Sequence, residues 1–125
     1  MSATSPVLAV VDDDADVRVA LTRLIHSAGF AVEPYASGAA FLRSIEDHEP
    51  DCVVLDLNMP EMSGLEVQAA LKAAHAAVPV LVITAHDSAE WRLRALDLGA
   101  RAYLRKPVDG ESLLSAIDEA LRGGR

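Results

Sequence analysis

VVLDLNMPEMSGLEV, residues 53–67, is the stretch that decides the fold of this chain. It starts as an apolar run, which ends at the single acid Asp56, and Pro60 separates that run from a helical pattern that begins at Ser63. An apolar run bounded by turn residues predicts a strand buried on both faces. The last residue of such a strand lies at the carboxyl edge of a sheet, where open α/β folds bind their ligands. Asp56 is therefore a candidate functional residue, although most aspartates at such places only cap a strand or start a turn.

Three other predicted strands end in polar groups that suit the same chemistry. They supply carboxylates, a hydroxyl and an amine, and in a parallel sheet these groups would meet at one edge. The groups are Asp12, Asp13 and Asp14 after residues 7–11, Thr84 after residues 80–83, and Lys106 after residues 102–105.

Length and composition indicate a single soluble domain. The chain has 125 residues, and we expect one domain over residues 1–125 with a core at about 6–122. Aromatic residues make up only 4%, so the core must be mainly aliphatic. No apolar run approaches the ~20 residues that span a bilayer, and residues 1–5 lack the pattern of a signal peptide. We expect a cytoplasmic protein in which the one cysteine, Cys52, packs in the core.

The net charge of −8 argues against direct contact with DNA. Proteins bind nucleic acids mainly by neutralising phosphates with Lys and Arg. Part of the negative charge is concentrated in the aspartates of residues 12–16, a cluster that suits a divalent cation.

Five strands alternate with five helices in the predicted order. We expect strands at about 7–12, 30–35, 53–56, 80–84 and 101–104, and helices that begin at Asp14, Ser37, Ser63, Ser88 and Asp109. The apolar stripes predict inward faces made of Val17, Ala20, Leu21, Leu24, Ile25, Ala28, Phe41, Leu42, Ile45, Val67, Ala70, Leu71, Ala74, Leu93, Leu96, Leu113, Ala116, Ile117, Ala120 and Leu121. Pro34 within the second strand suits an edge, and residues 123–125 suit a frayed end or linker.

This alternation predicts parallel strands joined by right-handed crossovers, with helices on both faces of the sheet. The expected fold class is α/β: a three-layer αβα sandwich, (βα)5, with a doubly wound five-stranded parallel sheet.

Four motifs in this order closely resemble the receiver domain of two-component response regulators, and most of all its FixJ type. They are VVDDD at residues 10–14, LDLNMPEMSGLE at 55–66, VITA at 82–85 and YLRKP at 103–107. The resemblance covers residues 7–121 and implies the flavodoxin-like, CheY-like version of the fold.

The resemblance implies that Asp56 is a phosphoacceptor, which takes a phosphoryl group from the phosphohistidine of a sensor histidine kinase. It makes the chain a signalling protein rather than an enzyme. It also implies a Mg²⁺ or Mn²⁺ site formed by Asp13, Asp56 and the backbone carbonyl of Asn58, with Asp12 acting through a water. Such an all-oxygen donor set suits these hard cations.

The remaining motif residues are expected to serve the phosphoryl group and its signal. By resemblance, Lys106 and Thr84 contact phosphoryl oxygens, Thr84 and Tyr103 form a coupled switch, and Asn58 and His86 tune the lifetime of the acyl phosphate. The Lys106–Pro107 bond is expected to be cis. The surface of the fourth helix, fifth strand and fifth helix, with Trp91, Arg92, Arg101 and Arg105, is the expected face for a partner or a homodimer.

The output stays open at this point. FixJ-type receivers usually continue into a LuxR-type helix-turn-helix domain, so the chain is either the N-terminal regulatory domain of a transcriptional regulator or a stand-alone regulator that binds other proteins. A degenerate, unphosphorylated receiver fits poorly, because every motif position holds the expected residue.

Three other classes of protein fit the sequence worse. A haloacid-dehalogenase-type aspartyl-phosphate phosphatase needs Thr or Val where Asp16 stands, an EF-hand needs Gly at Val17, and flavodoxin's FMN would be repelled by three aspartates.

Overall fold

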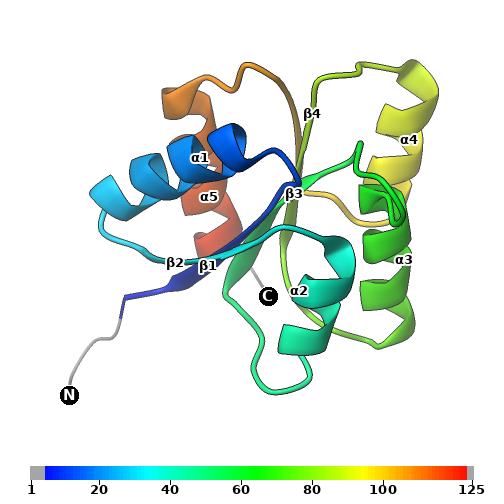
Figure 1. Cartoon of the computed structure of the whole chain (residues 1–125), viewed down its shortest axis with the longest axis horizontal. Coiled ribbons are helices and arrows are strands. Elements are labelled where there is room, and N and C mark those ends of the chain that lie inside the picture. Colours follow the sequence, from blue (N-terminus) through cyan, green and yellow to red (C-terminus); the bar gives the residue numbers. More distant parts are fainter. Residues whose placement is uncertain (1–4, 124–125) are drawn as a thin grey trace.

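The computed structural model describes residues 5–123, so the predicted tail at Gly124 and Arg125 and the segment 1–4 lie outside it. Within residues 5–123, five strands and five helices alternate, as predicted (Figure 1). The elements are β1 (Val7–Val11), α1 (Ala15–Ser27), β2 (Ala31–Tyr35), α2 (Gly38–Ser44), β3 (Cys52–Asp56), α3 (Gly64–Ala73), β4 (Val80–Thr84), α4 (Ala89–Asp97), β5 (Ala102–Arg105) and α5 (Gly110–Arg122).

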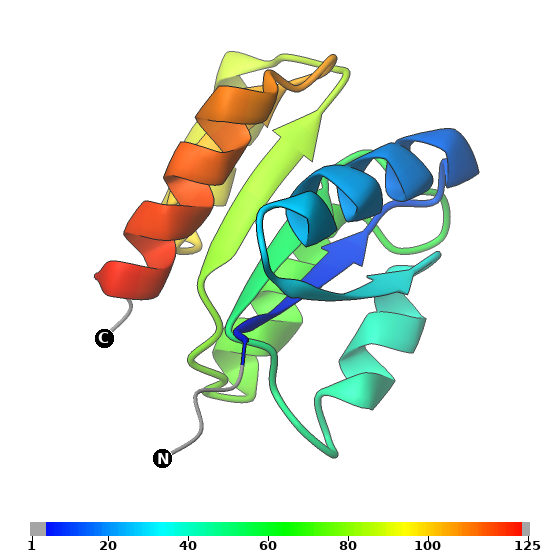
Figure 2. The same ribbon diagram turned by 90° about the vertical axis from the view of Figure 1, so that its left-hand side faces the viewer.

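The strands form one parallel sheet in the order β2-β1-β3-β4-β5. β3 is central, and its Val54 lies opposite Val10 of β1 and Leu81 of β4. Figure 2 shows α1 and α5 in front of the sheet, while α2, α3 and α4 cover the other face. The predicted three-layer αβα architecture is thus confirmed, with β2 and its Pro34 at an edge.

All five predicted helix starts are confirmed as N-caps. The side chain of each capping residue accepts a hydrogen bond from a backbone N–H of the first turn, which satisfies a donor that the helix itself leaves free. These residues are Asp14, Ser37, Ser63, Ser88 and Asp109. Ser63 and Glu66 form a complete capping box, with the Glu66 carboxylate accepting from the Ser63 N–H at 2.8 Å.

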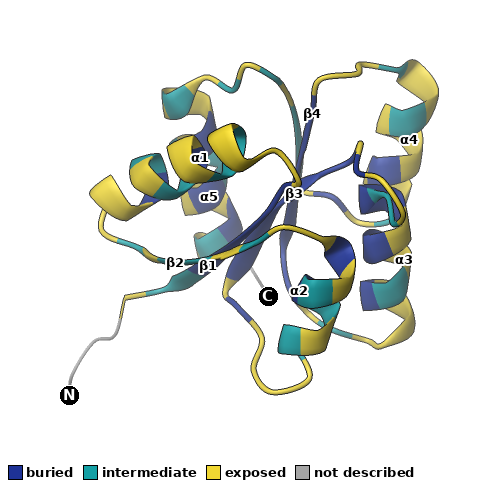
Figure 3. Cartoon of the chain, in the orientation of Figure 1, coloured by how far each residue is buried: buried dark blue, intermediate teal, exposed yellow. Residues whose placement is uncertain are grey.

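Two apolar layers, one on each face, hold the sheet between the helices, and Figure 3 shows how deeply the central strands are buried. Alternate residues of β1 pack into opposite layers. Ala9 and Val11 face α2, α3 and α4, whereas Leu8 and Val10 face α1 and α5. Every residue of β3 and β4 is buried, as predicted for central parallel strands. Cys52 is also fully buried, and burial raises the pKa of its thiol to about 12.

The prediction for the inward face of α4 is wrong. Leu93 is 68% exposed and Leu96 is 43% exposed, whereas Ala95 is completely buried. The true inward stripe is Trp91, Ala95 and Leu98, at i, i+4 and i+7. Small Ala95 suits this position because α4 lies close to α3. Three alanines that we predicted to face inward, Ala20, Ala28 and Ala74, are also exposed.

A hydrogen bond from a buried polar side chain links α3 to α4. The buried amide of Gln68 donates to the Ala95 carbonyl at 3.0 Å.

Within residues 5–123, no helix combines the length and the apolar character needed to cross a membrane.

The burial of α4 and α5 gives a direct stability test. We expect Leu113→Ala to lower the free energy of unfolding by about 2–5 kcal/mol, because Leu113 is fully buried between α5 and the sheet. Leu93→Ala should change it by less than about 0.5 kcal/mol, because Leu93 is mostly exposed. Urea denaturation monitored by circular dichroism measures both. A loss above 2 kcal/mol for Leu93→Ala would contradict the orientation of α4.

Candidate functional site

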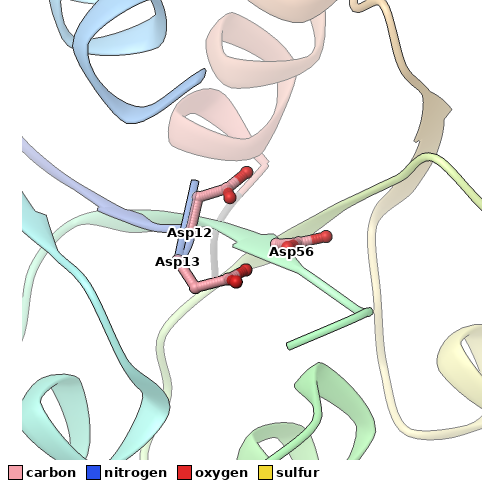
Figure 4. A group of neighbouring side chains, drawn as sticks. All are labelled: Asp12, Asp13 and Asp56. Atoms are coloured by element: carbon pink, nitrogen blue, oxygen red, sulfur yellow. The ribbon is translucent and has the colours of Figure 1, made fainter. Parts of the chain in front are cut away.

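The carboxyl ends of β1 and β3 bring three aspartates together, as the sequence predicts (Figure 4). Asp12 and Asp13 follow β1, Asp56 ends β3, and one carboxylate oxygen from each lies within 4.8 Å of the others. Asp12 is fully buried and Asp56 is 2% exposed, whereas Asp13 is exposed. Two acids thus line the bottom of the cluster, and the third lies at its open side.

The amine of Lys106 completes the cluster from the end of β5. Its Nζ lies 2.9 Å from Oδ2 of Asp12 and 3.5 Å from Oδ1 of Asp56. The backbone N–H of Lys106 donates to the Thr84 carbonyl at 2.8 Å, which fixes the end of β5 against β4. The Lys106–Pro107 bond is cis, as expected. One cation is therefore shared between the two buried carboxylates.

The turn after β3 holds Asp56 through its backbone. The N–H of Asn58 donates to Oδ1 of Asp56 at 3.2 Å, and the N–H of Gly64 donates to the Leu57 carbonyl at 2.9 Å. A Cβ added at Gly64 would lie 2.5 Å from the Asp56 carbonyl oxygen and 2.7 Å from Cα of Leu57. Only glycine lets α3 start this close to the end of β3.

The electrostatics of the cluster set its protonation. In the metal-free protein, burial and then the charge of Asp12 raise the pKa of Asp56 from 3.8 to about 6, against the opposing effect of Lys106. Burial disfavours the charged form of Lys106. Its hydrogen bond to Asp12 and the charges of Asp56 and Asp12 outweigh this, so the pKa of Lys106 lies above its usual value.

This donor set fits a hard divalent cation. Asp12, Asp13 and Asp56 offer only carboxylate oxygens, the ligands that Mg²⁺ and Mn²⁺ prefer. When all three carboxylates are ionised, their negative charge exceeds the single positive charge of Lys106. The acidic cluster could therefore hold a metal ion, which would relieve the remaining repulsion.

Thr84 and Tyr103 lie near the cluster on β4 and β5 but are engaged elsewhere. The Thr84 hydroxyl donates to the His86 carbonyl at 3.2 Å and accepts from the His86 N–H at 3.0 Å. The Tyr103 hydroxyl accepts from the Ser88 N–H at 3.5 Å, and the Arg92 guanidinium lies 5.7 Å from the centre of its ring. Neither hydroxyl hydrogen-bonds to the three aspartates.

A hollow of about 680 Å³ between α3 and α4 adjoins this site. Asn58 and Trp91 both line it, so it connects the turn after Asp56 to the first turn of α4. The ring of His86 lies 5.8 Å from that of Trp91. The one tryptophan of the chain thus lies where its fluorescence can report changes near the site.

Two residues that shape the site were not predicted from the sequence. Gly64 appeared there only as part of the motif at residues 55–66, and Arg18, whose Nη1 donates to the Asp12 carbonyl at 2.7 Å, was not singled out. Both act through proximity in three dimensions. The glycine within the motif could have indicated a close approach of two backbone segments. An arginine one turn into a helix gives no such indication in the sequence.

Comparison with known proteins gives a consistent result. Residues 8–118 match the family model of the response regulator receiver domain. The chain is 42% identical over 119 residues to the transcriptional regulatory protein PrrA of Mycobacterium tuberculosis, covering 95% of this chain and 51% of PrrA. It is 38% identical over 122 residues to the response regulator protein TodT of Pseudomonas putida F1, covering 98% and 54%. The chain thus spans about half the length of these curated relatives.

Solved structures agree in fold. The response regulator StyR superposes with a TM-score of 0.85 at 39% identity, over 97% of this chain and 61% of StyR. FixJ-N superposes with a TM-score of 0.89 at 32% identity, over 96% of each chain.

The raised pKa of Asp56 predicts a pH-dependent stability. Without metal, the folded protein keeps the Asp56 proton up to about pH 6, whereas the unfolded chain releases it near pH 4. Asp56 therefore costs stability as pH rises from about 4 to about 6, and the cost is complete above that range. Asp56→Asn should unfold with a higher free energy than wild type at about pH 7.5 in EDTA, by up to about 3 kcal/mol. The gain should vanish near pH 4.

Chemical denaturation across this pH range measures the difference, with exposed Asp47→Asn as the control. A gain for Asp56→Asn that does not depend on pH would contradict the raised pKa.

Proposed function

The chain belongs to the response regulator receiver domain family of two-component signalling, and we propose that it accepts a phosphoryl group on Asp56 and passes the signal to a partner protein. The observation that carries this proposal is the cluster at the carboxyl edge of the sheet. There Lys106 lies 2.9 Å from Asp12 and 3.5 Å from Asp56, and Asp13 stands at the open side. A nucleophile, a cation and a metal-binding acid thus lie together.

We propose that Asp13, Asp56 and the backbone carbonyl of Asn58 hold Mg²⁺ or Mn²⁺, with Asp12 acting through a water. When bound, the ion supplies positive charge to the transferring oxygens. Exposed Asp13 can meet an incoming ion, while buried Asp12 keeps its Oδ1 on the Asp14 N–H at 2.9 Å and its Oδ2 on Lys106. Asp12 therefore has little freedom to move onto the ion, which favours contact through water.

In the proposed reaction, a carboxylate oxygen of Asp56 attacks the phosphorus of a phosphohistidine on a sensor histidine kinase. An O–P bond forms on Asp56 as the N–P bond to the kinase histidine breaks. Lys106 stabilises the phosphoryl group as a point charge. Because the chain is itself the acceptor, it acts in signalling and not as an enzyme on a separate substrate; only its own phosphotransfer and dephosphorylation are self-catalysed.

Thr84 and Tyr103 are the proposed switch. To reach a phosphoryl oxygen, the Thr84 hydroxyl must leave His86, to which it now bonds at 3.0 and 3.2 Å. The space that it vacates can then take the ring of Tyr103, which lies opposite Val82 in the sheet. Such a shift needs an interaction that differs between the two states, and the new Thr84–phosphoryl bond provides one. In this proposal Asn58 and His86, beside the site, tune the lifetime of the acyl phosphate.

The surface of α4, β5 and α5 is the proposed partner or homodimer face. It carries exposed apolar side chains at Leu93 and Leu96, together with Arg92 against Tyr103. Exposed apolar side chains of this size next to charged ones are typical of protein interfaces. The net charge of −8, to which phosphorylation adds, argues against DNA binding by this chain itself.

Two outputs remain to be distinguished. We favour the N-terminal regulatory domain of a cytoplasmic transcriptional regulator, because PrrA and TodT are about twice as long as the matched region. The alternative is a stand-alone domain over residues 1–125 that acts only by binding proteins. The match of residues 8–118 to the receiver family favours both over an aspartyl-phosphate phosphatase.

Phosphorylation gives the first test of this proposal. Acetyl phosphate with Mg²⁺ should add one phosphoryl group to the intact protein, because Asp56 needs only a small phosphodonor and the ion. Asp56→Asn should gain none, whereas Asp47→Asn, which changes an exposed aspartate, should react like wild type. Intact mass spectrometry measures the addition. An Asp56→Asn variant that still gains the group would place the acceptor elsewhere.

The switch gives the second test. Thr84→Ala should still be phosphorylated on Asp56, but the change in Trp91 fluorescence should be reduced, because the hydroxyl that couples the site to Tyr103 is gone. Thr22→Ala, on α1, removes a hydroxyl that has no hydrogen-bond partner within residues 5–123, and it serves as the control. A Thr84→Ala variant whose fluorescence responds like wild type would show that the signal takes another path.

A further inference from the structure

All four polar atoms of Asp12 are in contact with other groups. One of these four contacts is made by a side chain of α1, that of Arg18. Its backbone N–H donates to the Tyr35 carbonyl at 3.1 Å, Oδ1 accepts from the Asp14 N–H, and Oδ2 pairs with Lys106. Its backbone carbonyl accepts from Nη1 of Arg18 at 2.7 Å. Arg18 therefore contacts the backbone of the acidic cluster and none of its carboxylates.

The carbonyl that Arg18 holds belongs to the peptide unit that joins Asp12 to Asp13. A peptide unit is planar, so the direction of its C=O also sets where the N and Cα of the next residue lie. Within residues 5–123, Arg18 is the only side chain that hydrogen-bonds to this unit. Its bond therefore fixes the backbone from which the Asp13 side chain projects.

Asp13 depends on that backbone more than its neighbours do. In the described part of the chain its carboxylate forms no hydrogen bond or ion pair, whereas those of Asp12 and Asp56 are both held. Because Asp13 is exposed, packing does not restrict it either. The position of its carboxylate relative to Asp56 follows mainly from the turn after β1.

The location of Arg18 suits this task. It lies one turn into α1, half-buried, and helical side chains point back toward the N-terminus, here toward the turn that holds Asp12. A hydrogen bond from a charged donor is shorter and stronger than one between neutral groups, which agrees with the 2.7 Å distance.

We propose that Arg18 is a positioning residue for the metal site, which presents Asp13 to a divalent cation by fixing the Asp12–Asp13 peptide unit. This inference rests on the proposed function, since it concerns the same acidic cluster. It assigns to Arg18 no contact with the ion or with the phosphoryl group. Loss of its bond should weaken metal binding and leave the chemistry of the loaded site intact.

The test compares Arg18→Met with wild type and with Arg23→Met. Met keeps an apolar stem of similar length but removes the guanidinium. Arg23 lies on the same helix, is exposed, and has no hydrogen bond or ion pair in the described chain, so Arg23→Met is the matched control. Mg²⁺ affinity is measured from the rise in melting temperature with Mg²⁺ concentration and from a fluorescence titration of Trp91. The rate of phosphorylation by acetyl phosphate is measured at low and at saturating Mg²⁺.

We expect the Mg²⁺ dissociation constant of Arg18→Met to rise about tenfold or more, as is typical when a group that orients a metal ligand is removed. At saturating Mg²⁺, its phosphorylation rate should return close to that of wild type. A merely structural role would lower the metal-free melting temperature and leave the Mg²⁺ dissociation constant unchanged. Arg18→Gln, which retains polarity, should raise the Mg²⁺ dissociation constant in the same way. It replaces Arg18→Met in the test if Arg18→Met does not fold.

An Mg²⁺ dissociation constant within twofold of wild type in the folded variant would overturn the inference while leaving the proposed function standing. A wild-type protein that shows no Mg²⁺ response would overturn both. A wild type that binds Mg²⁺ but is not phosphorylated would overturn the proposed function alone, because the effect of Arg18 on metal affinity would still be measured.

Discussion

Two carboxylates, those of Asp12 and Asp56, are buried side by side at the edge of the sheet, and the site depends on how their charge is balanced. Removing an ion from water costs several kcal/mol unless a partner compensates. Lys106 is the only cation that the described chain brings to both, at 2.9 and 3.5 Å. The balance is incomplete, since one cation faces two buried carboxylates, and burial together with the charge of Asp12 raises the pKa of Asp56 to about 6. A protein arranged in this way gains by binding a cation, and Asp56, the proposed phosphoacceptor, lies where that cation would bind.

The rest of the fold can be understood as support for this arrangement. Parallel strands place the ends of β1, β3, β4 and β5 at one edge, and two apolar layers keep those strands from moving. Gly64 lets α3 begin directly against Asp56, and the cap at Asp14 starts α1 directly after the acids. On the same side of the sheet, α4 is tied to α3 through Gln68 and exposes Leu93 and Leu96. In our proposal, a change at Asp56 reaches the proposed partner surface through Thr84 and Tyr103.

Much of this could be predicted from the sequence because the signals were local. Buried strands appear as apolar runs, helix starts appear as capping residues, and parallel topology brings the aspartates and Lys106 to one edge. The face of α4 was predicted wrongly because two stripes fit the helical period. Leu93 with Leu96 is the more hydrophobic one, but close packing against α3 favours small Ala95. Arg18 could not be found at all, since its contact with the Asp12 carbonyl depends on how the turn after β1 folds back toward α1.

The central claim is that the three aspartates form one metal-dependent phosphoacceptor site, and a crystal structure with Mn²⁺ and beryllofluoride tests it most directly. Beryllofluoride mimics a phosphoryl group, and Mn²⁺ is located by its anomalous scattering. We expect one Mn²⁺ ion in contact with Asp13 and Asp56, with beryllofluoride on a carboxylate oxygen of Asp56 and within reach of Lys106. Density for the ion away from these aspartates, or beryllofluoride on another residue, would contradict it.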